Sequence, residues 1–140
     1  MFKAIVFHGR ENHHQVTEDV VFFSSSESFS KNYGIVRPYK LFLNKPFNTS
    51  SKEDIEALLQ VVGSLKDKYN DSAYNIFDDL VTSSLLYNDT WKLFKPYVGD
   101  IRELGYDGMI IYENGVQNYV SFDSSKYKLC NPKLQLAIAL

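Results

Sequence analysis

Strand-forming segments lie at both ends of this chain, and segments with helical spacing occupy the residues between them. Residues 3–8 are apolar and favour a β-strand that ends at Gly9. Near the other end, residues 109–112 and 116–122 flank Asn114-Gly115, a dipeptide typical of a two-residue hairpin turn. This order of segments predicts an α+β fold with helices packed alongside a sheet.

The first part of the chain contains further short elements. A second strand is expected over residues 20–23 and a third over residues 37–43. The three serines at 24–26 supply hydroxyls suited to capping a helix that runs through Tyr33. Gly34 then fits the C-terminal cap of that helix.

The middle of the chain predicts three helices. Ser50 and Glu53 form a capping-box pattern, and the apolar residues that follow recur at helical spacing. The same spacing returns over residues 74–85 and 91–104. We therefore expect a helical insertion at about 51–104 within a single domain that spans residues 1–140. The apolar tail at 134–140 fits either a last strand or a short docked helix.

Composition limits the classes of function. A chain of 140 residues with 44% apolar content can bury one core, which agrees with a single domain. The formal net charge is -2, so the chain lacks the basic character of a protein that binds nucleic acid without sequence preference. No apolar run approaches the roughly 18 residues of a membrane span. We expect a soluble cytoplasmic protein that does not act at a membrane.

Cysteine and histidine usage gives no support for a metal site. Cys130 is the single cysteine, so it cannot form an internal disulfide, and no Cys/His spacing suits zinc. His13 and His14 are adjacent in a polar segment, where three convergent ligands are rarely available. The expectation is therefore a function without a metal.

Three stretches carry the chemical information. The first is Phe7-His8-Gly9, the second covers residues 21–34, and the third covers residues 105–123. In this order and at this spacing they resemble the ADP-ribosyltransferases of the diphtheria-toxin and poly-ADP-ribose polymerase type. They are most similar to the small domains found in phage and mobile-element polyvalent proteins. The resemblance implies an α+β fold with a split antiparallel β-sheet around a cleft and NAD as co-substrate.

The resemblance also implies roles for individual residues. His8 would hydrogen-bond the adenosine ribose, and the backbone of Gly9 would pair with the nicotinamide carboxamide. Ser30 matches the hydroxyl that completes the carboxamide contacts. Phe22 and Tyr33 match the two aromatic positions that hold the ring, and such stacking contributes about 0.5–1.5 kcal/mol per aromatic pair.

Two further residues complete the expected cofactor-binding set, and two positions depart from the family pattern. Arg10 and Ser24 adjoin the matched motifs and are included with them. Phe22 stands where the family has a tyrosine, so stacking is kept and a hydroxyl is lost. Asn118 stands at the catalytic glutamate position. Its amide can accept a hydrogen bond from the ribose, but it carries no charge to stabilise an oxocarbenium-like sugar.

The hairpin offers a second candidate for the catalytic position. A two-residue turn at 114–115 places Glu113 opposite Val116 and Ile111 opposite Asn118, so these four side chains share one face of the ribbon. Glu113 is then about 7–8 Å from Asn118 along the diagonal. A long side chain could reach the nicotinamide ribose from there. We therefore take Asn118 and Glu113 as the candidate catalytic residues.

The expected activity is mono-ADP-ribosylation of a macromolecular acceptor, with NAD as the donor. The resemblance to phage-borne domains implies that the acceptor is a host protein. Two other classes of function remain open. A catalytically silent domain could bind and block a partner protein, and an NAD glycohydrolase could use water as the acceptor in the same pocket.

Overall fold

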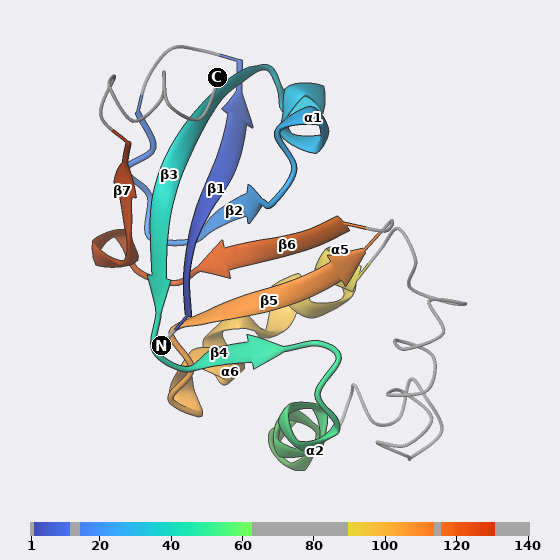
Figure 1. The fold of residues 1–140 in the computed structure, drawn as a ribbon. Coiled ribbons are helices and arrows are strands. Elements are labelled where there is room, and N and C mark those ends of the chain that lie inside the picture. The colour runs from blue at the N-terminus through green and yellow to red at the C-terminus, as the bar shows by residue number, and fades with distance from the viewer. Residues whose placement is uncertain (1, 12–14, 63–89, 114–115, 131–140) are drawn as a thin grey trace.

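The structure, a computed structural model, describes residues 2–11, 15–62, 90–113 and 116–130. The fold is α+β, and the strands of the described residues form a mixed seven-stranded sheet in the order β4-β5-β6-β2-β1-β3-β7 (Figure 1). The strands are β1 (Phe2–Arg10), β2 (Val21–Ser24), β3 (Ile35–Leu43), β4 (Pro46–Asn48), β5 (Gly108–Glu113), β6 (Val116–Ser121) and β7 (Tyr127–Leu129). The helices are α1 (Glu27–Ser30), η1 (Lys31–Tyr33), α2 (Lys52–Val61), α5 (Thr90–Phe94), η2 (Lys95–Tyr97), α6 (Val98–Glu103) and η3 (Ser124–Lys126).

The sheet consists of two halves that are joined at one point. β1 pairs with β3 along its whole length, and β2 pairs with β6 at each of its residues. Between the halves, β1 and β2 share only the register pair Phe7 and Ser24. Figure 1 shows the consequence, because β1 and β3 run in a different direction from β5 and β6. The two halves therefore diverge on either side of this pair.

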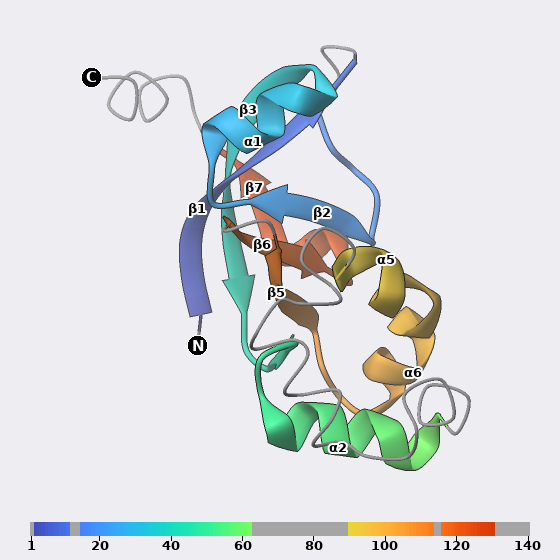
Figure 2. The same cartoon turned by 90° about the vertical axis from the view of Figure 1, so that its right-hand side faces the viewer.

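Two hydrophobic clusters hold these layers together. One joins the halves of the sheet and includes Val6, Phe23, Tyr39 and Tyr119. The other packs α2, α5 and α6 against the opposite face of β5 and β6, on the side away from β1 and β3 (Figure 2). Val120 belongs to this second cluster. β6 is thus buried on both faces from Asn118 onward, and this part of the strand carries the polar side chains of Asn118 and Ser121 as well as apolar ones.

The strand expected over residues 3–8 and the two strands of the hairpin are confirmed. The register places Glu113 opposite Val116 and Ile111 opposite Asn118, as the hairpin argument requires. The helix expected after residue 50 is also present as α2, but its N-cap is Ser51 rather than Ser50. The Ser50 N–H donates to Oδ1 of Asn48 at 2.8 Å, so Ser50 belongs to the preceding turn. Helix α2 consequently begins one residue later than the capping-box pattern indicates.

The sheet differs from the expected antiparallel arrangement at its edge. β4 was not predicted, and it pairs with β5 in parallel, so the sheet is mixed. Pro46 is the first residue of this strand, a place where its missing N–H is tolerated at a sheet edge. In the sequence, Pro46 indicates the end of the preceding strand, whereas in the structure it is the first residue of a new short strand. β7 was also missed, because three residues are too few to show a pattern.

The last of the three expected helices is divided. In place of one helix over residues 91–104, the structure has α5, the 3-10 turn η2 and α6. Pro96 lies in η2, where its missing N–H and its restriction of the preceding residue favour the change of direction. The helix expected over 74–85 and the tail at 134–140 lie outside the described residues. Among the helices that the structure describes, none is long and apolar enough to cross a membrane.

Candidate functional site

A pocket opens where β1 and β2 diverge. Its walls come from the end of β1, from β2, from the α1–η1 segment and from α5, and its volume is about 190 Å³. This volume is smaller than the roughly 300–1,000 Å³ of a site that encloses a whole drug-sized ligand. The pocket can therefore hold one ring of a larger molecule. The lining residues are Phe7, His8, Gly9, Phe22, Ser30, Tyr33 and Trp91.

Gly9 allows α1 to lie directly against β1. A Cβ added at this residue would be 2.0 Å from the Ser30 carbonyl oxygen and 3.3 Å from Cβ of Tyr33. The Ser30 hydroxyl donates to the carbonyl of Phe7 at 3.2 Å, which ties the end of α1 to the same strand. Any side chain at position 9 would push this segment away. Gly9 is therefore required for the packing of α1 on β1.

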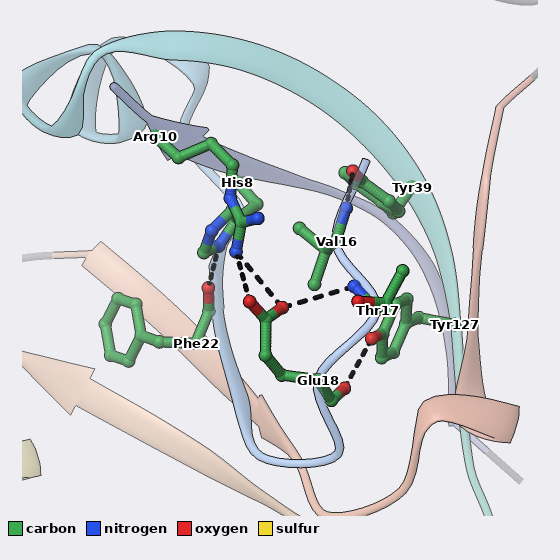
Figure 3. Close-up of polar contacts among 8 residues, drawn as sticks. All are labelled: His8, Arg10, Val16, Thr17, Glu18, Phe22, Tyr39 and Tyr127. Atoms are coloured by element: carbon green, nitrogen blue, oxygen red, sulfur yellow. Dashed lines mark hydrogen bonds and ion pairs between the residues drawn. The ribbon is translucent and has the colours of Figure 1, made fainter. Parts of the chain in front are cut away.

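His8 is held in one orientation by β2. Its Nδ1 lies 2.7 Å from the carbonyl oxygen of Phe22, and because a carbonyl only accepts, Nδ1 carries the proton (Figure 3). Burial lowers the pKa of His8 below its usual value, so the neutral ring is favoured. In that tautomer Nε2 is a hydrogen-bond acceptor. His8 can thus accept a hydrogen bond from a ligand hydroxyl, the contact expected for a ribose.

Aromatic rings form most of the remaining wall. The rings of Phe22 and Trp91 are 6.1 Å apart between centroids and tilted by 40°. Phe7 contributes from β1, and Tyr33 lies at the rim with 54% of its surface exposed. Aromatic faces attract flat and cationic rings, with tryptophan the strongest. The pocket is therefore suited to a positively charged aromatic ring such as nicotinamide.

Arg10 lies near the pocket but is engaged elsewhere. Its guanidinium contacts both carboxylate oxygens of Glu18, at 3.0 and 3.1 Å (Figure 3). Backbone hydrogen bonding of the Glu18 carboxylate lowers the pKa of Glu18, and Arg10 adds to this effect. Arg10 is absent from the pocket lining and acts on His8 only through its charge. Both contacts are made by Nη2, and Nε has no hydrogen-bond partner among the described residues.

The side chain of Ser24 stabilises the turn that follows β2. It is 1% exposed, and its hydroxyl accepts the N–H of Ser26 at 3.0 Å. This bond orders the segment between β2 and α1, as the capping argument for the serines indicates. Ser24 does not line the pocket. It contributes by positioning α1 and by pairing with both Phe7 and Asn118 in the sheet.

Asn118 is completely buried, and its side chain has no hydrogen-bond partner among the described residues. Its exposed fraction is 0%, and neither Oδ1 nor Nδ2 has a partner among the described residues. It faces Ser24 on β2 and Ile111 on β5, so it shares a face with Phe22, one diagonal step away. That step is about 7–8 Å in a regular ladder. Asn118 therefore lies behind the pocket wall that Phe22 forms, although it does not line the pocket.

The second catalytic candidate is placed only by its backbone. Glu113 is the last residue of β5, and it pairs with Val116. Its side chain lies outside the described residues, as does the turn at 114–115. The shared face of Glu113 and Asn118 is confirmed by the register.

Two pocket residues were not found by sequence reasoning. Trp91 reads as the first apolar position of a helix, which is usually a core position. It does pack beside the second hydrophobic cluster, yet it also lines the pocket. Phe7 belongs to the Phe7-His8-Gly9 stretch but was given no role of its own. A signal for Trp91 was its identity as the single tryptophan of the chain, but no spacing rule connects it to the other pocket residues, which lie 58 to 84 positions earlier.

Comparison with known proteins adds information about the fold. No protein-family model and no curated protein sequence matches the chain. A crystal structure of an anti-CRISPR protein is similar, with a TM-score of 0.52 and 14% sequence identity. The alignment covers 91% of this chain and 96% of that one. At this identity the similarity shows a shared α+β fold and carries no residue roles.

Proposed function

We propose that the chain is an NAD-dependent mono-ADP-ribosyltransferase that modifies a macromolecular acceptor, expected to be a host protein. In this reaction the glycosidic bond of NAD breaks, nicotinamide leaves with the bonding electrons, and an acceptor nucleophile bonds to the same carbon and loses its proton. The diverging halves of the sheet would form the cleft that the family uses. The cofactor needs no metal in this chemistry.

One observation carries the proposal. Of the seven residues expected to bind the dinucleotide, five line one pocket, namely His8, Gly9, Phe22, Ser30 and Tyr33, whereas Arg10 and Ser24 do not. The five pocket residues come from β1, β2, α1 and η1, so their meeting is not a result of adjacency in the chain. The orientation of His8 supports the role given to it, because Nε2 is available as a hydrogen-bond acceptor.

Asn118 supports a ribose contact and weakens the case for efficient catalysis. A buried amide without partners costs about 1–3 kcal/mol, so its retention favours a ligand that supplies the missing bonds. The amide nevertheless provides no negative charge near the developing cation. We therefore expect turnover to be slow compared with an enzyme that has glutamate at this position.

The acceptor class can be narrowed for testing. The similar structure is that of an anti-CRISPR protein, and the sequence resembles phage-borne domains. A component of a host CRISPR system is therefore the first acceptor to examine. This choice rests on the name of the structural neighbour and on no residue of this chain.

A silent binding protein is the second candidate, and Asn118 is the observation that favours it. If the fold only blocks a partner, the wild type would release no nicotinamide from NAD. Asn118→Glu would then create turnover where none existed, because it restores the charge. Turnover by the wild type would exclude this second candidate.

NAD binding is tested most directly by fluorescence. Trp91 is the only tryptophan in the sequence, so the emission of the whole protein reports on the pocket. We expect saturable quenching on titration with NAD, and at least tenfold weaker binding for His8→Ala. Lys92→Ala, an exposed neighbour of Trp91, is the matched control and should bind as the wild type does. A folded wild type whose emission does not respond to NAD would refute the proposal.

Transfer is tested with labelled NAD. The full chain is incubated with a bacterial lysate and NAD labelled in the adenosine part, and modified peptides are identified by mass spectrometry. Protein-bound label together with nicotinamide release supports a transferase. Nicotinamide release without protein-bound label supports a glycohydrolase.

A further inference from the structure

The outer face of β1 and β3 is uncovered along half its length. The inner face of these strands packs against the other half of the sheet through residues such as Val6 and Tyr39. On the outer face, α1 and η1 cover the end of β1 at Gly9. Beyond that end, Lys3, Ile5 and Lys40 are exposed, and the exposed fraction of Ile5 is 37%. This part of the sheet is an apolar surface open to solvent.

An open groove of about 330 Å³ follows this face. Lys3, Ala4, Ile5, Lys40, Leu41 and Phe42 line it. The groove lies near the pocket along β1, because Ile5 lines the groove and Phe7, two residues further on the same face of the strand, lines the pocket. Two strand residues span about 7 Å. A molecule seated in the groove would therefore reach the pocket entrance.

The charged side chains along the groove are all positive. Lys3 lies opposite Phe42, and Lys40 lies opposite both Ile5 and Lys128. None of these cross-strand positions is acidic, and within the described residues none of the three lysines has an ion-pair partner. The chain as a whole is nevertheless negative, at -2. Lys3 Nζ lies 5.9 Å from the centroid of the Phe42 ring. Three lysines without an ion-pair partner among the described residues make this face a local exception to the net charge of the protein.

This combination favours a protein partner over nucleic acid. A nucleic-acid backbone is usually held by many cations along a continuous track, whereas this face has three lysines among apolar side chains. Protein interfaces commonly join an apolar centre to complementary charges at the rim. The charge that complements this face is negative.

We propose that the face formed by Lys3, Ile5, Lys40, Phe42 and Lys128, the lysine face, docks an acidic apolar patch of the acceptor protein. The identification of this partner as the acceptor rests on the proposed function. Docking there would bring an acceptor side chain to the pocket entrance beside Phe7. The lysine face would then select the target, while the pocket holds the donor.

The surface is tested without activity by NMR titration of the 15N-labelled full chain. The probe is a soluble glutamate-rich peptide that contains two leucines. We expect saturable shifts centred on the amides of Lys3, Ile5 and Lys40, and binding that weakens as salt is raised. Lys3→Glu with Lys40→Glu should weaken binding by about tenfold or more. The matched control, Lys92→Glu with Lys95→Glu, reverses two exposed charges on the helical side and should change binding less than about twofold.

Other outcomes overturn the inference. Shifts centred elsewhere, or equal weakening by the control pair, would remove the lysine face as the site. Tighter binding of a DNA oligonucleotide of equal charge would assign the face to nucleic acid. Shifts on the face that depend on protein concentration in the absence of peptide would assign it to a second copy of the chain.

The same variants separate this inference from the proposed function. The Lys3→Glu and Lys40→Glu variant should quench with NAD as the wild type does, but label protein acceptors about tenfold more slowly. If the wild type fails to bind NAD, the proposed function fails, and the peptide titration still decides whether the lysine face docks acidic protein. If NAD binds and labelling is unchanged in the variant, the docking inference alone fails.

Discussion

The two sides of the candidate site are built differently. On the β1 side, His8 donates to a carbonyl, Gly9 is packed against α1, and the Ser30 hydroxyl is bonded to the strand. On the β6 side, Asn118 is buried and has no partner for either polar atom among the described residues. The first side is ordered before any ligand arrives. The second side retains polar groups without a hydrogen-bond partner among the described residues, so the two sides differ in how far their polar groups are satisfied.

This difference indicates that donor binding and turnover, the two parts of the proposed activity, depend on different strands. Preorganised contacts lower the loss of entropy on binding, so the β1 side should determine affinity for the donor. Catalysis depends on interactions that strengthen in the transition state, and an uncharged amide supplies little of that kind. Affinity and turnover should therefore respond to changes on different strands.

The largest loss of stability is expected from a substitution that disturbs the close packing of α1 on β1. In Gly9→Ala the new methyl would meet the Ser30 carbonyl at 2.0 Å, so α1 must move away from β1. We expect a loss of about 3 kcal/mol in the free energy of unfolding and loss of NAD binding. Urea denaturation followed by tryptophan fluorescence measures the first, and NAD titration the second.

Gly99→Ala is the control for that change. A Cβ at Gly99 meets nothing within 4 Å, and the residue lies in α6. Replacing a helical glycine by alanine stabilises by about 0.5–1 kcal/mol. Equal destabilisation by both variants would show that the packing of α1 on β1 is not special.

The second largest effect is expected on the β6 side, where a substitution should increase stability rather than reduce it. Asn118→Leu replaces an unpartnered buried amide by an apolar side chain of similar shape. We expect the protein to become more stable by about 1–2 kcal/mol. Nicotinamide release should fall by at least tenfold, with NAD affinity changed much less. A destabilised variant would mean that Asn118 is hydrogen-bonded in solution, and unchanged turnover would remove it from the reaction.

Sequence reasoning selected five of the residues that line the pocket because their signals are local. A strand that ends in His-Gly, a short helix after capping serines and two aromatics at fixed spacing can each be recognised within a few residues. The hairpin register at Asn118 followed from the turn at 114–115 in the same way. These features depend on backbone geometry that neighbouring residues determine.

The remaining features depend on contacts between distant segments. Trp91 reaches the pocket only because α5 packs against β5, where the Thr90 hydroxyl donates to the Tyr112 carbonyl at 3.3 Å. β4 exists because β5 offers an edge for it, and its three residues show no periodicity of their own. The pairing of Arg10 with Glu18 likewise joins β1 to a loop of irregular structure. None of these contacts follows a regular sequence spacing, so none could be predicted from the sequence.

A smaller effect concerns pH. Burial keeps the folded-state pKa of His8 below its usual value of 6.5, so the folded protein favours the neutral ring. The unfolded chain then binds more protons, and the stability contributed by neutral His8 falls as the pH drops from about 6.5 toward the lowered pKa. His8→Gln has no titrating ring and should lose this part of the pH dependence. Denaturation midpoints of both proteins from pH 7.5 to 5 measure it, and parallel curves would contradict the assignment.

The smallest effect is expected at the rim of the pocket. Tyr33 is 54% exposed and lines the pocket with one face of its ring. Tyr33→Phe keeps the ring, so NAD affinity should change less than about twofold, whereas Tyr33→Ala removes a stacking partner worth about 0.5–1.5 kcal/mol. That energy corresponds to a roughly two- to tenfold loss of affinity. Because the residue is exposed, neither variant should shift the denaturation midpoint much. Equal losses of affinity in both variants would show that the hydroxyl makes the contact, and the ring would then have no part in holding nicotinamide.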